Sequence, residues 1–342
     1  MKASEDVALS GYSTMGLGGR ASYLAEVSSK DEIVKAVIWA KSYGLNCIMI
    51  GGGSNIIWKD EGFQGLVIVN QIKGYSVYDE DETNKYVTVG AGELWDSVVE
   101  RSVSQGLTGI EALSLIPGSA GATPIQNVGA YGQDISQTLT TVEAFDAQEN
   151  KIVVIPASEC QFGYRTSRFK TTDKNRYFIT AITLHLMKAN PSPPFYSSLA
   201  AYLESNHITS YTPQTIREGV IYIRSNKLPD PKRIRNTGSF FSNPIVPESL
   251  LIELTDKYSS VPHWPAGQGL IKLSAAWLIE QAGLKGVHDK ETGMSTWPTQ
   301  PLVLVNDEAT STADLIKFRD KVIDTVKAKF GVTLEQEPEL LP

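Results

Sequence analysis

The stretch from residue 109 to residue 132, GIEALSLIPGSAGATPIQNVGAYG, constrains the fold most because it shows neither helical nor strand periodicity. A loop this long inside a compact chain is usually functional or disordered, and the apolar residues Ile125 and Val128 argue against disorder. Its glycines leave room for a ligand beside the backbone, and its amides and Tyr131 add hydrogen-bonding and stacking groups. These features suit a planar cofactor that carries phosphates, while a purely structural Ω-loop is the alternative.

A second glycine-rich segment, IGGGSN from Ile50 to Asn55, follows NCIMI, which is predicted to be a short buried strand. Successive N–H groups in such a turn can hold an anion, although a tight turn without a ligand explains the same residues. The dinucleotide-binding pattern G-x-G-x-x-G fails here at Ile56, and it fails again in GAGELW at Trp95. The sequence contains no G-x-x-x-x-G-K-[ST] motif, which disfavours a P-loop NTPase.

Helix and strand patterns on both sides of the loop predict a mixed fold of helices and strands. A capping box of Ser29 and Glu32 begins a helix that Gly44 ends, and a second helix is expected over 93–106. Strands are predicted at GLVIVN, KYVTVGAG, TVEAFDA, KIVVIPA and YFITAITLHL, the third and fourth forming a hairpin. The segment ending in KLPDP resembles a linker, so we expect a domain boundary near Pro229. Beyond it, helices are predicted at LSAAWLIEQAG and TSTADLIKFRDKVIDTVKAKFG, with the strand PLVLVN between them.

Charge and composition exclude several functions. A net charge of -7 over 342 residues argues against non-specific nucleic-acid binding. Cys47 and Cys160 form no C-x-x-C pair, and the four histidines are scattered, so we expect a reducing cytoplasm and no metal site. No apolar run approaches the roughly 18 residues of a spanning helix, and no signal peptide is recognisable, so no membrane association is expected.

A few polar residues stand at positions where chemistry could occur. Arg165 in FGYRTS is either a surface charge or a guanidinium that binds a carboxylate. Lys227 lies at the predicted domain junction, where ligand clefts often form. One of the three glutamates in TLEQEPE could point inward from a strand while the others are solvated. The neighbours of Ser239 in RNTGSFFSNP leave open whether its hydroxyl closes a turn or serves chemistry.

Taken in order, IGGGSN, IPGSAGATPIQNVGAYG, FGYRTS, RSNKLPDP, NTGSFFSNP, KLSAAWLIEQAGLKG, LVLVN and LEQE resemble the motifs of the UDP-N-acetylenolpyruvoylglucosamine reductase family. The resemblance covers nearly the whole chain and implies an α+β fold. Residues 1–228 would form a two-subdomain FAD-binding region of the vanillyl-alcohol-oxidase type, and residues 229–330 a small α+β substrate-binding domain. Residues 331–342 would form a C-terminal strand that returns to the active site. The glycine loops contain no histidine or cysteine, which favours non-covalent FAD.

The activity implied by this resemblance is the NADPH-dependent reduction of UDP-N-acetylglucosamine enolpyruvate to UDP-N-acetylmuramate, a cytoplasmic step of peptidoglycan synthesis that serves cell shape and division. A hydride passes through FAD, and a serine then supplies a proton. We expect a monomer. The implied catalytic residues are Ser239, Glu337 and Arg165. The implied substrate-binding residues are Tyr196 (in PPFYSSLAAY, a match to the tyrosine loop of one subclass), Lys227, Asn243, Lys285 and Gln300. The implied FAD-binding residues are Gly51, Gly53, Ser54, Asn55, Pro117, Gly118, Ser119, Gly121, Ala122, Thr123, Ile125, Asn127, Gly129, Tyr131 and Arg224.

Two positions depart from the family pattern. Ser242 stands where a basic residue is common, and the chain ends in PELLP, which differs from the usual ending and leaves the anchoring of the last strand in question. Two other functions fit parts of the sequence: an FAD-linked oxidase of a sugar or hydroxy acid with the same fold, and a non-catalytic protein that binds a nucleotide sugar. A yellow purified protein would argue against the latter.

Overall fold

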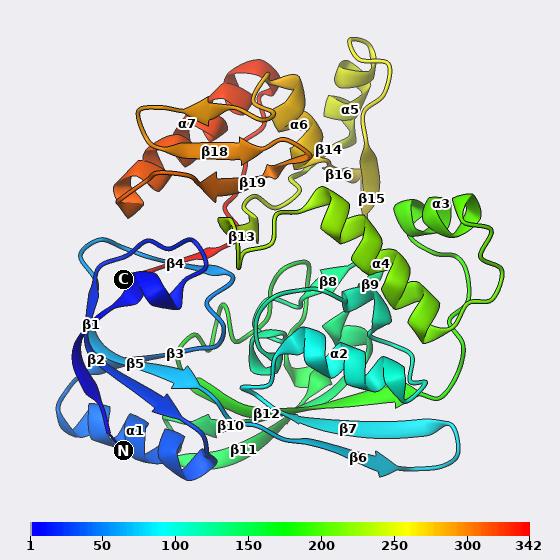
Figure 1. The fold of residues 1–342 in the computed structure, drawn as a ribbon. Coiled ribbons are helices and arrows are strands. Elements are labelled where there is room, and N and C mark those ends of the chain that lie inside the picture. Colours follow the sequence, from blue (N-terminus) through cyan, green and yellow to red (C-terminus); the bar gives the residue numbers. More distant parts are fainter. Residues whose placement is uncertain (1) are drawn as a thin grey trace. The chain divides into compact units, whose positions relative to one another are not determined.

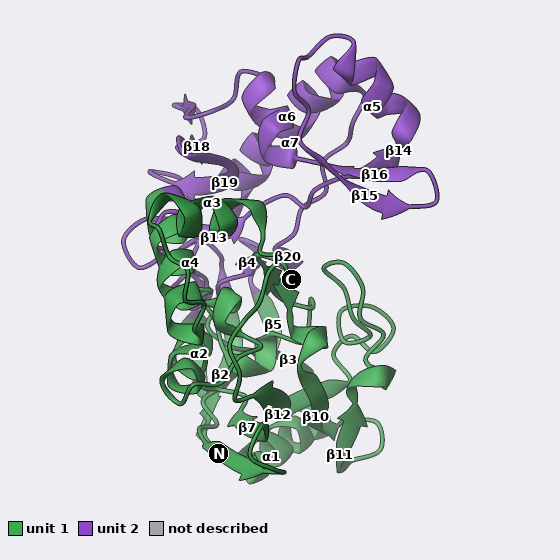
Figure 2. Ribbon diagram, turned by 90° about the vertical axis from the view of Figure 1, so that its right-hand side faces the viewer, with its two compact units in different colours: residues 1–7, 21–52, 63–226 green, residues 8–20, 53–62, 227–342 purple. Residues whose placement is uncertain are grey.

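The computed structural model describes residues 2–342 and divides them into two compact units (Figures 1 and 2). Unit 1 contains the residues up to Val7 together with 21–52 and 63–226, and unit 2 contains 8–20, 53–62 and 227–342. Neither unit is continuous in the sequence, because two short N-terminal segments belong to unit 2. The expected division into an FAD-binding region and a substrate-binding domain concerns function, and it stays a prediction.

The first sheet of unit 1 has the order β1-β2-β5-β3, formed by β1 (Ser4–Ala8), β2 (Arg20–Val27), β5 (Phe63–Asn70) and β3 (Asn46–Ile50). Strands β2 and β3 both run parallel to β5, and α1 (Lys30–Ser42) connects β2 to β3. Figure 1 shows α1 lying along this sheet, and it buries Ile33, Val37 and Ala40 there. The predicted strands and the predicted helical face are therefore confirmed.

Helix α1 also begins close to where the capping pattern predicts. Ser29 Oγ accepts a hydrogen bond from the backbone N–H of Glu32 at 3.2 Å. The Glu32 carboxylate, however, accepts from the N–H of Ser28 at 2.7 Å, one residue before the position that a regular capping box uses. The φ angle of Gly44 is +65°, which is the left-handed conformation expected just past a helix end.

The second sheet of unit 1 has the order β11-β10-β12-β7-β6, formed by β11 (Lys151–Pro156), β10 (Leu139–Asp146), β12 (Tyr177–Met187), β7 (Asn84–Gly90) and β6 (Tyr75–Asp79). The antiparallel pairing of β10 with β11 confirms the predicted hairpin. Helix α2 (Trp95–Ser104) buries Val98, Val99 and Val103 in the same core as Val87 and Val89 of β7. The chain passes directly from β7 into α2, and this connection later contacts the glycine loop.

The chain is helical up to the first residue of KLPDP, and residues 228–234 contain neither helix nor strand. Unit 1 contains α3 (Ser197–Ser205) and α4 (Pro213–Lys227), and α4 ends only at Lys227. Pro213 occupies the first helical position, where its missing N–H costs no hydrogen bond. The helices are stable because they pack on each other, with Leu199 and Leu203 against Ile216 and Val220, rather than because of strong local signals.

Unit 2 is built on the sheet β13-β19-β18-β17, formed by β13 (Arg235–Ser239), β19 (Gln300–Asn306), β18 (Met294–Trp297) and β17 (His288–Asp289). Helices α6 (Ala275–Gln281) and α7 (Thr312–Phe330) match the two helices predicted here. The predicted apolar face of α7 is buried in the core of this unit. A small sheet of β14 (Ile245–Pro247), β16 (Leu270–Leu273) and β15 (His263–Gly267), with α5 (Glu248–Thr255), was not predicted.

The C-terminal strand is β20 (Glu339–Leu341), which pairs in parallel with β4 (Ile56–Trp58). It begins later than residue 331, where the sequence places the start of a closing strand. Before it, Gln336 forms an isolated bridge with Phe241. The pairing of β4 with β20 explains why residues 53–62 belong to unit 2. Within residues 2–342, no helix has the length and apolar character needed to cross a bilayer.

Asp60 of the β4 segment offers a test of this arrangement, because its carboxylate accepts hydrogen bonds from the N–H groups of Thr312 (2.7 Å) and Ala313 (2.9 Å) at the start of α7. These two donors have no partner within the helix, so Asp60→Ala leaves them unsatisfied. We expect a loss of about 1–2 kcal/mol in the free energy of unfolding. Thermal unfolding followed by circular dichroism measures it. The exposed neighbour Glu61 is the control, and an equal effect of Glu61→Ala would contradict the capping role.

Candidate functional site

The two glycine-rich segments of the sequence meet backbone to backbone in unit 1. A Cβ added to Gly51 would lie 2.0 Å from Ser119 Oγ, and one added to Gly52 would lie 3.2 Å from the Cα of Gly118. Any side chain at Gly51 would therefore require Ser119 to move. This close approach leaves bare main chain where the sequence predicts a phosphate-bearing cofactor, and bare main chain suits a diphosphate.

The glycine loop, residues 109–132, is also fastened along the connection from β7 to α2. The backbone N–H of Gly121 donates to the carbonyl of Ala91, Ala120 donates to Glu93, and Trp95 donates to Gly118, all within 2.9–3.0 Å. A Cβ on Gly121 would lie 2.5 Å from the Cβ of Ala91, so this glycine serves close packing. The loop is thus an ordered part of unit 1 although it contains only short 3₁₀ turns and the two-residue strand β8 (Gly129–Ala130).

Two polar side chains predicted to bind FAD already have hydrogen-bond partners within unit 1. Asn127 has a φ of +47°, its Nδ2 donates to the carbonyl of Gly163 (3.2 Å), and its Oδ1 accepts from the N–H of Ser136 (3.1 Å). Thr123 Oγ1 donates to the carbonyl of Ala120 at 2.7 Å. These contacts hold the loop in place, so both side chains are engaged before any ligand binds.

Arg165 lies beside the end of the glycine loop. Its Nη2 donates to the carbonyl of Gly129 at 2.9 Å, and its own backbone has a φ of +55°. The fully buried Ser167 holds the same turn, since its Oγ donates to the carbonyl of Ile125 at 2.6 Å. The predicted catalytic arginine and the predicted FAD loop are therefore adjacent within unit 1.

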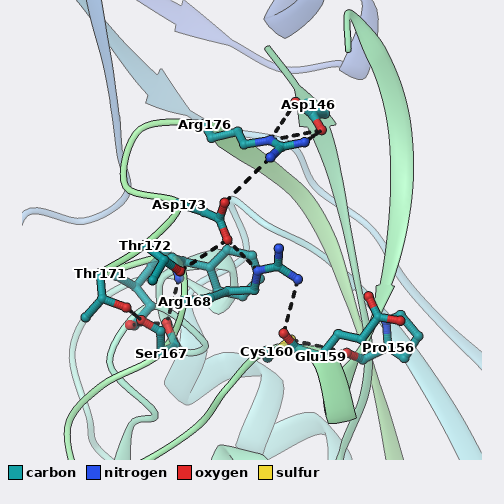
Figure 3. Close-up of polar contacts among 12 residues, drawn as sticks. Asp146, Pro156, Glu159, Cys160, Ser167, Arg168, Thr171, Thr172, Asp173 and Arg176 are labelled. Atoms are coloured by element: carbon teal, nitrogen blue, oxygen red, sulfur yellow. Dashed lines mark hydrogen bonds and ion pairs between the residues drawn. The ribbon is translucent and has the colours of Figure 1, made fainter. Parts of the chain in front are cut away.

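A chain of ion pairs joins residues that follow Arg165 in the sequence to β10 (Figure 3). Arg168 Nε lies 2.6 Å from Asp173 Oδ2, and Arg176 Nη1 lies 3.7 Å from Asp173 Oδ1. Arg176 also binds the buried carboxylate of Asp146, with Nη2 to Oδ2 at 2.7 Å. Hydrogen bonds from Arg176, with burial opposing them, hold the pKa of Asp146 below its ordinary value, so this carboxylate stays charged at neutral pH.

Tyr131, Tyr196 and Arg224 form a second cluster in unit 1. The rings of Tyr131 and Tyr196 are 5.8 Å apart, edge to face, and Arg224 contacts the Tyr131 hydroxyl. Burial raises the pKa of Tyr131 and lowers the pKa of Arg224. The Nε of Arg224 is buried and has no hydrogen-bond partner among residues 2–342. An orphaned guanidinium N–H of this kind is costly unless a ligand accepts from it, which fits an anionic or carbonyl-bearing cofactor.

Ser239 ends β13 of unit 2 next to an irregular turn. The register against β19 shifts between Asn236 and Ser239, and Gly238 has a φ of +73°. Asn236 Oδ1 accepts from the N–H of Gly238 at 2.8 Å and fixes this turn. Phe240, which follows Ser239, is fully buried, while Ser239 itself is half-buried.

Glu337 lies beside this serine within unit 2. Its backbone N–H donates to the carbonyl of Phe240 at 2.9 Å, and the N–H of Ser242 donates to the carbonyl of Glu335 at 2.9 Å. The C-terminal segment thus runs along the residues that follow Ser239. Glu337 is half-buried and Glu335 is exposed, which favours Glu337 as the inward glutamate.

The remaining residues predicted to bind substrate are spread over unit 2. Asn243 Oδ1 accepts from the N–H of Ala275 at 3.0 Å and so holds the start of α6. Lys285 is on the surface with its Nζ 2.7 Å from Glu280. Gln300 begins β19, and the carbonyl of Lys227 accepts from Thr299 Oγ1 at 2.7 Å.

Sequence analysis missed two residues that touch the start of the glycine loop. Asp96 binds the backbone N–H of Leu115, and Arg217 binds Ser114. An acidic residue in the first turn of a helix is an ordinary signal, so nothing in the sequence distinguishes Asp96.

Among residues 2–342, no group of three or more His, Cys, Asp or Glu side chains is arranged to hold a metal ion.

Comparison with known proteins identifies the class. Residues 21–155 match a family of FAD-binding domains. The crystal structure of UDP-N-acetylenolpyruvylglucosamine reductase from Thermus caldophilus superposes with a TM-score of 0.68 at 23% identity, covering 100% of both chains. The fold is thus α+β with an FAD-binding part of the vanillyl-alcohol-oxidase type, as expected, and the protein is an FAD-binding flavoprotein.

The particular family follows from closer relatives. Residues 230–341 match the C-terminal domain of UDP-N-acetylenolpyruvoylglucosamine reductase. Proteins of that name from Thermobifida fusca (40% identity, 99% of this chain and 98% of the relative) and Escherichia coli K12 (34%, 95% and 93%) align over nearly their whole length. The chain belongs to the UDP-N-acetylenolpyruvoylglucosamine reductase family and is an FAD-dependent oxidoreductase.

Gly51→Ala tests whether the contact of the two glycine segments holds FAD. The added methyl would overlap Ser119 Oγ, so we expect the purified variant to retain well under half of the flavin per protein. The ratio of flavin absorbance to protein concentration measures this. Gly11→Ala is the control, because a Cβ there meets no atom within 4 Å. Ser119→Gly removes the overlapping atoms and should restore part of the flavin to Gly51→Ala. Full flavin in Gly51→Ala alone would show that this contact does not position the cofactor.

Proposed function

We propose that the protein reduces UDP-N-acetylglucosamine enolpyruvate to UDP-N-acetylmuramate with NADPH, a step of peptidoglycan precursor synthesis. Family membership over almost the whole chain supports the substrate. The geometry that supports it best is in unit 2, where the N–H of Glu337 binds the carbonyl of Phe240, the residue after Ser239. A serine hydroxyl and a glutamate carboxylate thereby lie along one short stretch of backbone.

The overall change adds a hydride and a proton across one carbon–carbon double bond, while NADPH becomes NADP⁺. FAD, when bound, would supply the hydride chemistry that links NADPH to the carbon β to the substrate carboxylate. Main-chain atoms of the glycine loop, Gly51 and the half-buried Arg224 are the groups proposed to hold it. The protein's other task is then to stabilise the negative charge that develops and to protonate the neighbouring carbon.

Arg165 is proposed to stabilise the developing enolate. Its guanidinium is anchored at Gly129, so it is already oriented before substrate binds, which is what electrostatic stabilisation requires. Glu337 is proposed to act near the same carboxylate. Ser239 is proposed to donate the proton. A serine hydroxyl is a weak acid in water, but an enolate is a strong base, and the buried Phe240 and Phe241 limit the water nearby.

The substrate-binding assignments are also proposals. Lys227 and Lys285 would meet the diphosphate, and for Lys285 this means exchanging its ion pair with Glu280. Asn243 and Gln300 would hydrogen-bond other parts of the sugar nucleotide. Tyr196 would place the chain in the subclass with a tyrosine loop. It is supported by the edge-to-face contact of Tyr196 with Tyr131 of the glycine loop.

Compartment and assembly complete the proposal. Both nucleotide substrates are cytoplasmic compounds, so we place the reaction in the cytoplasm. The cysteines Cys47 and Cys160 are free thiols, and burial raises their pKa values to about 12 and about 11, which makes them poor nucleophiles. We expect a monomer.

Oxidation of NADPH that requires the enolpyruvyl nucleotide tests the activity directly, and oxidation of a sugar with oxygen consumption would favour an oxidase instead.

Ser239→Ala separates proton donation from turn formation. Flavin reduction by NADPH needs no proton at the substrate carbon, so we expect it to proceed at nearly the wild-type rate. Reoxidation of the reduced flavin by the enolpyruvyl substrate should slow on the order of a hundred- to ten-thousand-fold. Stopped-flow absorbance measures the two half-reactions separately. Ser239→Cys should recover part of the rate, since a thiol can also donate. Equal slowing of both half-reactions would indicate a structural role, and rapid reoxidation in the alanine variant would exclude proton donation.

The two nearby glutamates form a matched pair. Glu337→Gln keeps the shape of the side chain and removes its charge. Because an electrostatic contribution to catalysis is lost, we expect kcat to fall by about tenfold or more. Glu335→Gln makes the same change on an exposed side chain two residues earlier and should leave kcat unchanged. Steady-state kinetics with NADPH and the enolpyruvyl nucleotide compare them. The assignment of Glu337 fails if the two variants behave alike.

A further inference from the structure

An ion pair in unit 1 joins two helices to the start of the glycine loop. Asp96 Oδ1 accepts from Arg217 Nη1 at 2.6 Å, and Asp96 Oδ2 accepts from Arg217 Nη2 at 3.2 Å. The same Oδ1 accepts from the backbone N–H of Leu115 at 2.6 Å, and Arg217 Nη1 also donates to Ser114 Oγ at 2.9 Å. One carboxylate–guanidinium pair therefore holds two consecutive residues of the loop.

The two partners of this pair differ in burial, since the side chain of Asp96 is 34% exposed. The side chain of Arg217 is 7% exposed, and Ser114 is fully buried. Burial opposes ionisation of Asp96, but hydrogen bonds from Arg217 and Leu115 outweigh it, so the pKa of Asp96 lies below its ordinary value. Loss of the Asp96 charge is costly in such a pair, because the buried Arg217 charge is left without its carboxylate.

Leu115 needs such a contact to keep its conformation. Its φ is +57°, a region that a leucine rarely adopts, and its side chain is 39% exposed, so packing does little to hold it there. The hydrogen bond to Asp96 is made by its own backbone N–H. Three residues later, the carbonyl of Gly118 accepts from Trp95, the neighbour of Asp96. The path from Leu115 to Gly118 is thus fixed from the first turn of α2.

The other end of the loop is connected through α4. Arg217 and Arg224 are seven residues apart on this helix, which places them on the same face two turns from each other. Arg217 meets Asp96 of α2, and Arg224 meets Tyr131 near the end of the loop. Figures 1 and 2 show α2 and α4 side by side. The position of α4 against α2 therefore affects both ends of the loop.

We propose that Asp96 and Arg217 are positioning residues for FAD: their ion pair holds the left-handed turn at Leu115 and sets α4 so that Arg224 meets Tyr131. Neither residue is assigned a contact with the cofactor. The inference rests on the proposed role of the glycine loop in FAD binding.

Asp96→Asn is the first test, with Asp289→Asn of unit 2 as its matched control. Asp289 is likewise a carboxylate paired with a cation, Lys321 Nζ at 2.6 Å, and it also accepts from a backbone N–H, that of Glu291 at 2.9 Å. Its side chain is 6% exposed, against 34% for Asp96. Free flavin in a dilution series of the purified holoprotein gives the dissociation constant for FAD. We expect Asp96→Asn to raise it roughly ten- to a hundredfold, in line with the loss of hydrogen bonds to a charged group, and Asp289→Asn to leave it unchanged.

Leu115→Gly supplies a readout that a general loss of stability would not change. Glycine adopts positive φ without steric cost, so in a Leu115→Gly background Asp96→Asn should raise the FAD dissociation constant only about threefold or less. Arg217→Lys keeps a buried charge beside Asp96 but removes the paired geometry, so it should fold and give an intermediate increase.

Either of two results overturns the proposal. The first is an FAD affinity in Asp96→Asn and Arg217→Lys that equals that of Asp289→Asn, and the second is an equal loss of FAD affinity for Asp96→Asn with and without Leu115→Gly.

The wild-type protein separates this proposal from the proposed function. If it binds FAD but does not reduce the enolpyruvyl nucleotide, the proposed function fails while the positioning test stands. If it reduces the nucleotide and the variants bind FAD normally, only the positioning role fails.

Discussion

The contact between bare backbone segments at Gly51, Gly52, Gly118 and Ser119 is the constraint on which the rest of unit 1 depends. A Cβ at Gly51 would lie 2.0 Å from Ser119 Oγ, so the turn after β3 and the glycine loop approach each other only if one side has no side chain. Since β3 belongs to the first sheet of unit 1 and the loop packs on the connection between β7 of the second sheet and α2, this contact joins the two layers. At this contact the surface that we propose for FAD would consist of main-chain atoms.

In unit 2, the packing around Ser239 gives this serine a defined position at the edge of the hydrophobic core. Ser239 follows a left-handed glycine and precedes two buried phenylalanines, so the strand is irregular just before the serine and firmly packed just after it. The C-terminal segment then binds the main chain of Phe240 and continues into the pairing of β20 with β4. The unusual ending PELLP supplies this strand, and Leu341 is buried in it, so the departure from the family pattern does not prevent the anchoring.

The sequence predicts those parts of this structure whose causes are local. The hairpin of β10 and β11 and the buried face of α7 follow from alternation, helical spacing and capping residues over a few positions. Helices α3 and α4 were missed because their stability comes from packing on each other. The assignment of residues 53–62 to unit 2 depends on β4 meeting a strand at the other end of the chain. Asp96 was missed for the same reason, since its partner Arg217 lies 121 residues away.

The residues with positive φ angles around the glycine loop share a cause that the sequence alone does not reveal. Positive φ angles occur at four non-glycine residues in or beside the glycine loop: Leu115, Asn127, Tyr131 and Arg165. Strained residues of this kind persist only where the surroundings hold them. Each of the four has such a contact. The backbone N–H of Leu115 binds Asp96, and the side-chain amide of Asn127 binds the N–H of Ser136. Tyr131 binds Arg224, and Arg165 donates to the carbonyl of Gly129. None of these partners belongs to the strained residue's own turn. Contacts with other segments of the chain therefore shape the loop. The conformation of the glycine loop is therefore a property of the packed unit 1 rather than of the glycine motif alone.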